Sequence, residues 1–290
     1  MITKTLFIIL GVFSLSVFAP LVSGIIRKIK DNLRMRQGMR IFQPYYNLSK
    51  LFSKDEVISK HTSWIFHIAP VVVFVSTICA CFLFFIARQN SGLSALACLL
   101  ALFFVLSLGR FFLALAGLDA ASSFGGMGSS REMFISSFAE PIAFVSVLVL
   151  FMNSTPGIKT SVLLAGFAFF MVVISETSRI PVDNQETHLE LTMVHEAMVL
   201  EYSGRNLALI ELTSHIKQIL LFVIISLYFF PFEIAALGWM LFPVKIILIG
   251  VIIALVELSV AKMRLFRVVD FLGFSFFIAL LAVIAASLGY

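Results

Sequence analysis

Long apolar stretches that alternate with shorter polar segments dominate the chain. Eight stretches of about twenty residues are each long enough to cross a bilayer core of roughly 30 Å at about 1.5 Å per helical residue. They cover approximately residues 5–26, 65–87, 93–116, 133–152, 160–177, 216–233, 239–260 and 269–289. The pattern predicts an all-α, polytopic membrane helix bundle with about eight transmembrane helices, which forms one integral membrane domain over residues 1–290.

Basic residues lie mostly in alternate segments between these stretches, whereas the other segments have Lys4, Arg88 and Lys159. Short cytoplasmic loops carry an excess of Lys and Arg, so the basic segments are predicted to be cytoplasmic loops of a multi-pass protein of the cell inner membrane. Both termini are then expected on the outer side. The predicted cytoplasmic loops are 27–64, 117–132, 178–215 and 261–268.

The segment 41–52, IFQPYYNLSKLF, is too short to span a membrane but has helical periodicity. Ile41, Tyr45, Leu48 and Phe52 fall on one face, so the segment is predicted to be an amphipathic helix along the interface. That face is either a lipid-facing anchor or one wall of a lateral cleft that admits an amphipathic molecule. The spacing fits both interpretations.

Composition supports the membrane assignment and argues against several other classes. The chain is 60% hydrophobic and 13% charged, whereas soluble domains are roughly 45–50% apolar and about a quarter charged. The formal net charge of +5 comes from residues beside the spans, which is typical of membrane orientation and not of nucleic-acid binding. Cys79, Cys81 and Cys98 have no C-x-x-C spacing, which argues against iron–sulfur, zinc or disulfide sites here. Redox cofactors are therefore expected in partner chains.

Carboxylates are concentrated between the fifth and sixth apolar stretches. If this segment is partly helical, Asp183, Glu186 and Glu190 follow one face, and carboxylates held that close favour uptake of a proton by one of them. Such a row can exchange protons through water. A solvated acidic face that docks a basic partner is the alternative, and both remain open. Residues 176–204 hold six of the 16 acids: Glu176, Asp183, Glu186, Glu190, Glu196 and Glu201.

Glu140 lies inside the apolar run 134–151 and directly precedes Pro141, which cannot donate a backbone hydrogen bond. An acid at such a depth is expected to be hydrated or paired. Arg110 in the third stretch and Lys245 in the seventh are available counter-charges. Because ionisable residues inside spans commonly mark ion pathways, Glu140 is predicted to be functional.

Glu257 and the two histidines of the acidic segment have plainer interpretations. Glu257 is expected to pair with Lys262 or Arg264 near the cytoplasmic end of the seventh stretch. His188 and His195 share a helical face and titrate near neutrality, so they are neutral interfacial residues or members of a proton relay. The zinc motif H-E-x-x-H begins at His195 but lacks its second histidine, so no metal site is predicted.

The stretch 117–132, GLDAASSFGGMGSSRE, is rich in glycine and serine. It lacks the Lys-Ser/Thr ending of a phosphate-binding loop and follows no predicted strand, so nucleotide binding is not expected. A tight cytoplasmic turn that lets neighbouring helices pack closely is the simpler interpretation.

Three stretches together carry a family resemblance. The first reads Glu176-Thr177, Arg179, Pro181, Asp183, Glu186, Glu190-Leu191 and Glu201-Tyr202-Ser203-Gly204. The second reads Gly117-Leu118-Asp119 through Ser130-Arg131-Glu132, followed by Glu140-Pro141. The third reads Arg34-Met35-Arg36-Gln37-Gly38, Gln43 and Lys50-Leu51-Phe52. They resemble the membrane subunit shared by respiratory complex I, where it is called subunit 1, and by group 4 membrane-bound nickel–iron hydrogenases.

The second stretch is closer to the hydrogenase branch of that family, to which the membrane subunits of hydrogenase-4 and formate hydrogenlyase belong. Met39 stands where the family has a proline, and Asn47 stands where it commonly has an acid. In complex I this loop helps to form the quinone cleft, so the two departures argue against quinone binding. His188 replaces a loop carboxylate, which indicates a divergent branch.

The resemblance implies a membrane subunit that contacts a hydrophilic, hydrogenase-like or complex I-like redox arm and antiporter-like membrane subunits. Such a subunit couples electron transfer to proton or sodium translocation, with iron–sulfur clusters and any nickel–iron centre in its partners. The implied proton-path residues are Glu140, Asp183, Glu186, Glu190, Glu201 and, in place of a loop acid, His188. The implied counter-charges are Arg131, Arg179 and Lys217. The implied cleft or arm-interface residues are Arg34, Arg36, Phe42 and Tyr46.

Three other functions stay open at this point. A quinone-reducing complex I subunit predicts a cavity near Arg36, Phe42 and Tyr46. A stand-alone secondary transporter predicts inverted repeats, of which the sequence gives no clear sign. A purely structural anchor predicts that Glu186 and Glu190 dock the redox arm.

Overall fold

The computed structural model describes residues 2–59, 62–152, 159–184, 193–229 and 238–289. Within these residues the secondary structure is helical throughout, as predicted. The elements are α1 (Ile2–Leu33), α2 (Gln43–Phe52), α3 (Trp64–Gln89), α4 (Leu93–Asp119), α5 (Ser123–Met152), α6 (Thr160–Glu176), α7 (His195–Val199), α8 (Gly204–Ile224), the π-helix η1 (Ile225–Phe229), α9 (Gly238–Ser259) and α10 (Leu265–Ser287).

Seven helical segments of the described chain are long and apolar enough to cross a membrane: α1, α3, α4, α5, α8 with η1, α9 and α10. Helix α6 is apolar but has 17 residues, which gives about 25 Å at 1.5 Å per residue. Apart from one or two end residues, the described part of each of the eight predicted stretches lies on one of these helices. The prediction of a polytopic bundle with about eight spans is therefore confirmed, and the chain is a multi-pass membrane protein.

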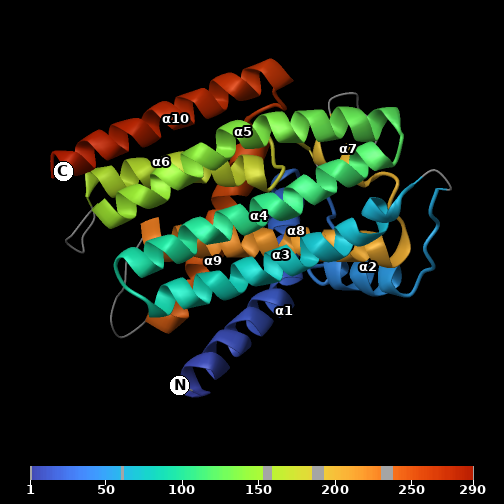
Figure 1. Cartoon of the computed structure of the whole chain (residues 1–290), viewed down its shortest axis with the longest axis horizontal. Helices are drawn as coiled ribbons and strands as arrows, with labels where there is room; N and C mark the ends of the chain where they lie inside the picture. The colour runs from blue at the N-terminus through green and yellow to red at the C-terminus, as the bar shows by residue number, and fades with distance from the viewer. Residues whose placement is uncertain (1, 60–61, 153–158, 185–192, 230–237, 290) are drawn as a thin grey trace.

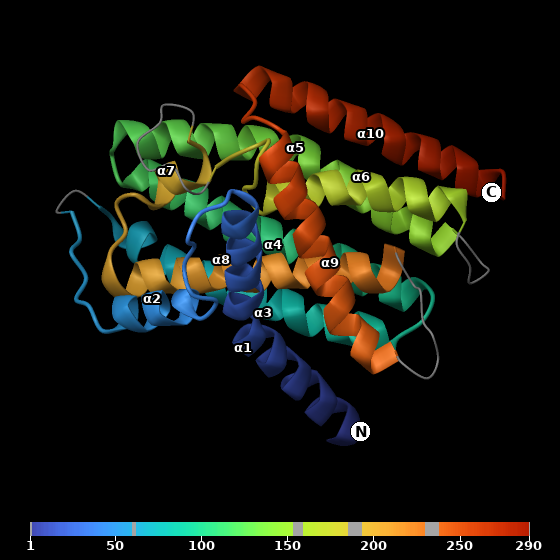
Figure 2. The same ribbon diagram turned by 180° about the vertical axis from the view of Figure 1, so that it is seen from behind.

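Most of the helices run along the long axis of the molecule, and two cross it. Helices α3, α4, α5, α6 and α8 lie lengthwise, and α10 lies beside α5 and α6 (Figure 1). Helices α1 and α9 cross the opposite side of the bundle at a steep angle (Figure 2). Helices α2 and α7 lie at one end, together with the link between α4 and α5. We call this the loop end.

The helices continue beyond the apolar stretches at the loop end, which corrects three predicted loop boundaries. Of the segment 117–132, residues 120–122 link α4 to α5 and the rest is helical. Helix α1 continues to Leu33, and α8 begins at Gly204. Hydropathy shows only which part of a helix lipid surrounds. The helix can extend past that part where its backbone groups stay hydrogen-bonded and its inward side chains stay packed. The polar residues of these segments consequently lie on helix faces.

The glycine-rich stretch lets helices approach closely, as predicted, although it is not a turn. A Cβ atom added at Gly125 would lie 2.3 Å from the carbonyl oxygen of Gly117, and one at Gly128 would lie 2.8 Å from that of Val194. Both contacts are shorter than real Cβ atoms make. The small residues thus allow α5 to pack tightly on α4 and on the segment before α7.

Helix α2 is the predicted amphipathic segment, and it packs against α1 and α8. Pro44 and Leu48 are buried in that contact, whereas Ile41 and Phe52 are exposed. The predicted apolar face is therefore divided between the bundle and the surroundings. Tyr45 also donates a hydrogen bond to a carbonyl group of α1. Helix α2 is thus fastened to the bundle by specific contacts.

A polar layer crosses the bundle between two apolar clusters. Along α4, Leu106 belongs to the larger cluster and Leu113 to the smaller cluster at the loop end, with Arg110 between them. Along α3, Ser76 and Thr77 occupy the corresponding interval and are buried. The buried charged side chains gather at this level.

Candidate functional site

Arg110 of α4 is the centre of a buried ionic cluster. Its side chain is 7% exposed, and its Nη1 atom lies 3.1 Å from Oε1 of Glu140 on α5. The Nη2 atom donates a hydrogen bond to Oε2 of Glu176 at the end of α6. The Nε atom lies 3.8 Å from Oε1 of Glu132, also on α5. One guanidinium thus holds three carboxylates from two helices.

Lys217 extends this cluster to α8. Its Nζ atom lies 2.7 Å from the same Oε2 atom of Glu176 that bonds Arg110. The set of five side chains, which we call the Arg110 cluster, contains two cations and the three carboxylates of Glu132, Glu140 and Glu176. When all five side chains are ionised, the three carboxylates exceed the two cations by one charge. Binding of one proton would then make the cluster neutral. Removing net charge from a membrane interior is favourable.

A second buried cluster lies between α1 and α9. The carboxylate of Glu257 is 3.0 Å from Lys30 Nζ and 3.2 Å from Arg179 Nη1. Arg179 also donates a 3.1 Å hydrogen bond to Oε1 of Gln218, which accepts another from Ser23 Oγ at 3.1 Å. We call these residues the Glu257 cluster. Because Gln218 follows Lys217 on α8, the two clusters meet at that helix.

A polar cavity of about 60 Å³ lies between the clusters. A water molecule needs roughly 10–15 Å³ of such space, so the cavity has room for about four. Arg179 and Gln218, which line the cavity, each have a buried nitrogen atom without a hydrogen-bond partner among the described residues, and water in the cavity can satisfy these atoms. Its lining includes Ser23, Arg27, Ser76, Thr77, Arg110, Glu132, Glu176, Arg179, His195, His215, Lys217 and Gln218. A hydrated cavity can therefore connect the two clusters.

The side chain of Glu140 faces outward as well as inward. It is 29% exposed, and it borders an open groove between α4 and α5. Phe104, Leu108 and Phe111 of α4 and Met133 of α5 form apolar walls of this groove. The Arg110 cluster thus ends at a lateral opening on the bundle.

This geometry can be compared with known proteins. The family model described as NADH dehydrogenase matches residues 4–288, which is nearly the whole chain. The chain belongs to the NADH dehydrogenase family.

Within the NADH dehydrogenase family, two relatives from Escherichia coli (strain K12) match most of the chain. Hydrogenase-4 component C is 31% identical over 289 residues, which covers 90% of each chain. Formate hydrogenlyase subunit 4 is 27% identical over 294 residues and covers 92% of this chain and 95% of its own. A chain of the membrane-bound sulfane sulfur reductase, an archaeal respiratory membrane complex, has the same fold, with a TM-score of 0.82 at 18% identity and coverage of 98% and 99%. The resemblance inferred from the motifs is confirmed.

The family motif at Glu201-Tyr202-Ser203-Gly204 fastens the start of α8 to the first turn of α3 and to the segment before it. The Tyr202 ring stacks on Phe66 at 4.0 Å between centroids, and its hydroxyl donates a 3.0 Å hydrogen bond to the Phe66 carbonyl. Ser203 exchanges hydrogen bonds of 2.8 and 3.0 Å with the backbone of Val57. Gly204 has φ +54 and leaves no room for a Cβ beside the Asp55 carbonyl. Burial, with a contribution from the charge of Asp119, raises the pKa of Tyr202.

Asp183, a predicted proton-path residue of this NADH dehydrogenase family motif, is a buried anchor in the structure. Its carboxylate accepts hydrogen bonds from the backbone N–H groups of Asn184, Val194 and His195 at 2.8–3.2 Å. Lys262 Nζ lies 2.9 Å from the same carboxylate. These partners close the ends of the acidic segment and tie it to the connection between α9 and α10. Glu186, His188 and Glu190 lie outside the described residues.

Some of the remaining predicted residues belong to the two clusters, and the others lie at or near the surface. Of the predicted counter-charges, Lys217 and Arg179 belong to the two clusters, and Arg131 donates a 2.9 Å hydrogen bond to the Met193 carbonyl. Glu201 is exposed at the turn before α8. Of the predicted arm-interface residues Arg34, Arg36, Phe42 and Tyr46, the last three are exposed and Arg34 is half-buried.

One pairing differs from the sequence-based expectation. Glu257 pairs with Lys30 and Arg179, so the expected pairing with Lys262 or Arg264 is wrong; its side chain points into the bundle toward α1. Sequence reasoning also missed Lys30, Glu132 and Gln218 as cluster members and placed Glu176 in a loop motif. One sequence feature could have identified two of these residues. Glu132 and Glu176 are ionisable residues at the ends of predicted spans, where a charge next to hydrocarbon is unfavourable.

Proposed function

We propose that this chain is the membrane subunit of an energy-converting respiratory complex of the hydrogenase-4 and formate hydrogenlyase kind. It anchors a redox arm on the cytoplasmic side, with the loop end facing that arm, and it couples electron transfer there to movement of protons or sodium ions. The membrane is the cell inner membrane, and both termini lie on its outer side. Iron–sulfur clusters and any nickel–iron centre belong to the partner subunits.

The observation that carries this proposal is the Arg110 cluster. Ionisable groups inside a membrane bundle are unfavourable, and they are typically retained on ion or proton pathways. Here Arg110 joins carboxylates on α5 and α6, and Lys217 carries the contact on to α8. The cluster can gain or lose one proton with its partners in place, which a simple anchor does not require.

We infer the direction of transfer from the arrangement of the cavity, the cluster and the groove. His195 of α7, at the loop end, lines the cavity, and Glu176 and Arg110 line it as well. Arg110 stays charged and holds the carboxylates in place, while Glu140 takes up the proton and presents it at the groove between α4 and α5. A change of charge in the arm would alter proton affinity in the cluster through the low-dielectric bundle. Antiporter-like membrane subunits would accept the ion at the groove.

The test compares Glu140→Gln and Glu176→Gln with Glu56→Gln in membrane vesicles that contain the complete complex. Both cluster variants should abolish redox-driven acidification, measured with a pH-sensitive dye, because glutamine cannot carry the proton. Glu56 is exposed, lies outside the clusters and is not a predicted path residue, so its variant is the matched control and should retain ion movement. Assembly is measured by co-purification of the redox arm. Normal acidification in both cluster variants would contradict the proposal, and release of the arm would favour the structural-anchor function.

Quinone reduction is less well supported by the geometry. Arg36 borders an open depression whose other lining residues are Lys28, Asn32, Met35, Gln37 and Gly38. Phe42 and Tyr46, which the quinone hypothesis places at the same cavity, do not belong to that lining. This arrangement agrees with the departures at Met39 and Asn47 from the complex I pattern.

A further inference from the structure

Aromatic residues lie beside the Arg110 cluster on the side away from the loop end. Phe103 precedes Arg110 by two turns of α4, and Phe169 precedes Glu176 by two turns of α6. Residues seven apart share a helix face and lie about 10 Å apart along the axis. Because both helices run toward the loop end, the two phenylalanines lie farther from that end than the charges do.

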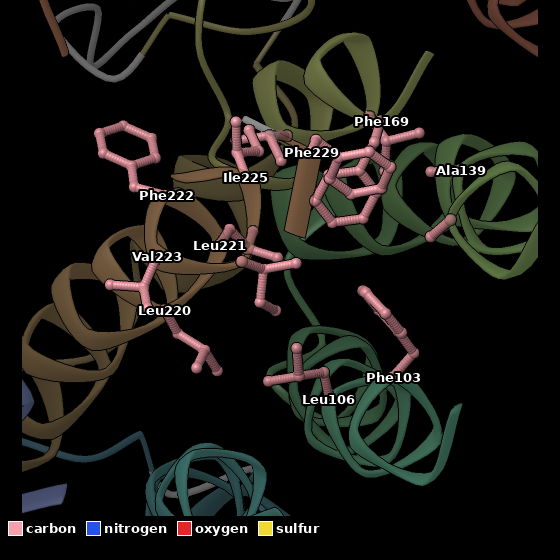
Figure 3. Packing of buried hydrophobic residues seen from close by; sticks show 14 of the residues in the cluster. Phe103, Leu106, Ala139, Phe169, Leu220, Leu221, Phe222, Val223, Ile225 and Phe229 are labelled. Atoms are coloured by element: carbon pink, nitrogen blue, oxygen red, sulfur yellow. The ribbon is translucent and has the colours of Figure 1, made fainter. Parts of the chain in front are cut away.

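The third aromatic residue comes from the π-helix that continues α8. Phe169 and Phe229 stack with ring centroids 5.0 Å apart and an interplanar angle of 20°, and Phe103 meets Phe169 edge-on at 5.9 Å. The close view shows these rings between the ribbons of α4, α6 and η1, with Leu106 and Leu221 beside them (Figure 3). All three phenylalanines are buried members of the large apolar cluster.

The space between the charges and the rings is small. A cavity of about 10 Å³ is lined by Arg110, Glu140 and Glu176 and also by Phe103 and Leu221. Its volume is roughly that of one water molecule at most. A proton or ion that moved from the cluster away from the loop end would enter a layer of aromatic rings and aliphatic side chains. It would lose its polar partners there, which carries a large desolvation penalty.

We propose that Phe103, Phe169 and Phe229 form an aromatic seal that insulates the Arg110 cluster from the far end of the bundle. Apolar constrictions in membrane proteins block ions by excluding water. The seal closes the direct route across this chain and leaves the groove at Glu140 as the way out of the cluster. Its role in translocation rests on the proposed function, whereas its insulating property does not.

The first experiment measures passive proton leak through the full-length chain in liposomes that contain a pH-sensitive dye. A potassium diffusion potential set with valinomycin drives proton entry. The double variant Phe169→Ala, Phe229→Ala should leak roughly tenfold faster than the unchanged chain, the effect of a barrier lower by about 1.4 kcal/mol. The control is Phe277→Ala, which removes an exposed ring of α10. A folded double variant that leaks no faster than this control would overturn the seal.

The second experiment tests dryness with a smaller change. In a background with Cys79, Cys81 and Cys98 replaced by alanine, single cysteines are placed at Phe169 or at His195, a half-buried residue of the loop end that lines the polar cavity. A membrane-impermeant thiol reagent should modify the cysteine at position 195 and leave the one at position 169 unreacted. Equal modification at both positions would refute the seal, even if the alanine variant does not fold.

The two experiments separate this inference from the proposed function. Neither uses redox turnover, so each reports on the seal alone. An intact seal together with normal ion pumping by Glu140→Gln would leave the seal standing and contradict the proposed path. A leaky unchanged chain would contradict the seal without bearing on that path.

Discussion

Replacement of Arg110 by methionine tests whether the buried charges depend on one another. Methionine has a similar length and no charge, so the variant leaves Glu132, Glu140 and Glu176 with Lys217 as the remaining cation of the cluster. The side chain of Arg110 is 7% exposed, which limits compensation by solvent. Removing one partner of a buried ion pair costs about 3–5 kcal/mol.

The size of this effect can be translated into a melting temperature. For chains larger than 150 residues, a loss of 1 kcal/mol lowers Tm by about 2 °C or somewhat more. The expected decrease for Arg110→Met is therefore roughly 6–10 °C. Adding Glu176→Gln removes one orphaned carboxylate and should restore part of the loss, with a coupling energy of about 1–3 kcal/mol.

Intrinsic fluorescence during heating of the detergent-purified, full-length chain measures these changes. Arg205→Met is the matched control because Arg205 is exposed at the start of α8, and surface substitutions change stability by about 0.5 kcal/mol or less. An Arg110→Met protein that melts within about 1 °C of this control would show that the guanidinium does not hold the cluster together. If adding Glu176→Gln does not restore stability, the ion pair between Arg110 and Glu176 is not what the Arg110→Met variant loses.

Two further predictions concern the second cluster and the family motif. Glu257→Gln should couple to Lys30→Met by about 0.5–3 kcal/mol in a double-mutant thermal cycle and should be additive with Lys262→Met; coupling to Lys262 instead would refute the observed pairing. Tyr202→Phe should lower Tm by roughly 2 °C through loss of about 1 kcal/mol from one hydrogen bond. Since burial and Asp119 raise the folded-state pKa of Tyr202, the stability that it contributes is full below about pH 10 and is lost above it. The Tm difference should therefore shrink between pH 8 and pH 11, and a constant difference would contradict this account.

The spans and the interfacial helix could be predicted because lipid imposes them locally. A run of about twenty apolar residues has few alternatives to a membrane helix, and the stretch around Glu140 was recognisable as a charge in an apolar run. Its pairing with Arg110 was one of two options that the sequence offered, and the structure selects it.

The pairings across the bundle could not be predicted from one sequence. Lys30 and Glu257 lie at opposite ends of the chain, and their contact depends on how α1 and α9 cross. Sequence spacing predicts that Asp183 belongs to an acidic row, because spacing does not show where a turn directs a carboxylate. In the structure, backbone N–H groups surround it. Glu186 and Glu190 stay predictions, since they lie outside the described residues.

Gln218 has a consequence for how the molecule stores charge. Neighbouring residues on a helix point about 100° apart, so Lys217 reaches toward Glu176 while Gln218 bonds Arg179 and Ser23. An amide has no ionised form at physiological pH, so Gln218 adds no charge at the point where the two clusters meet. The bundle therefore holds two separate groups of buried charges side by side, and a neutral side chain stands between them.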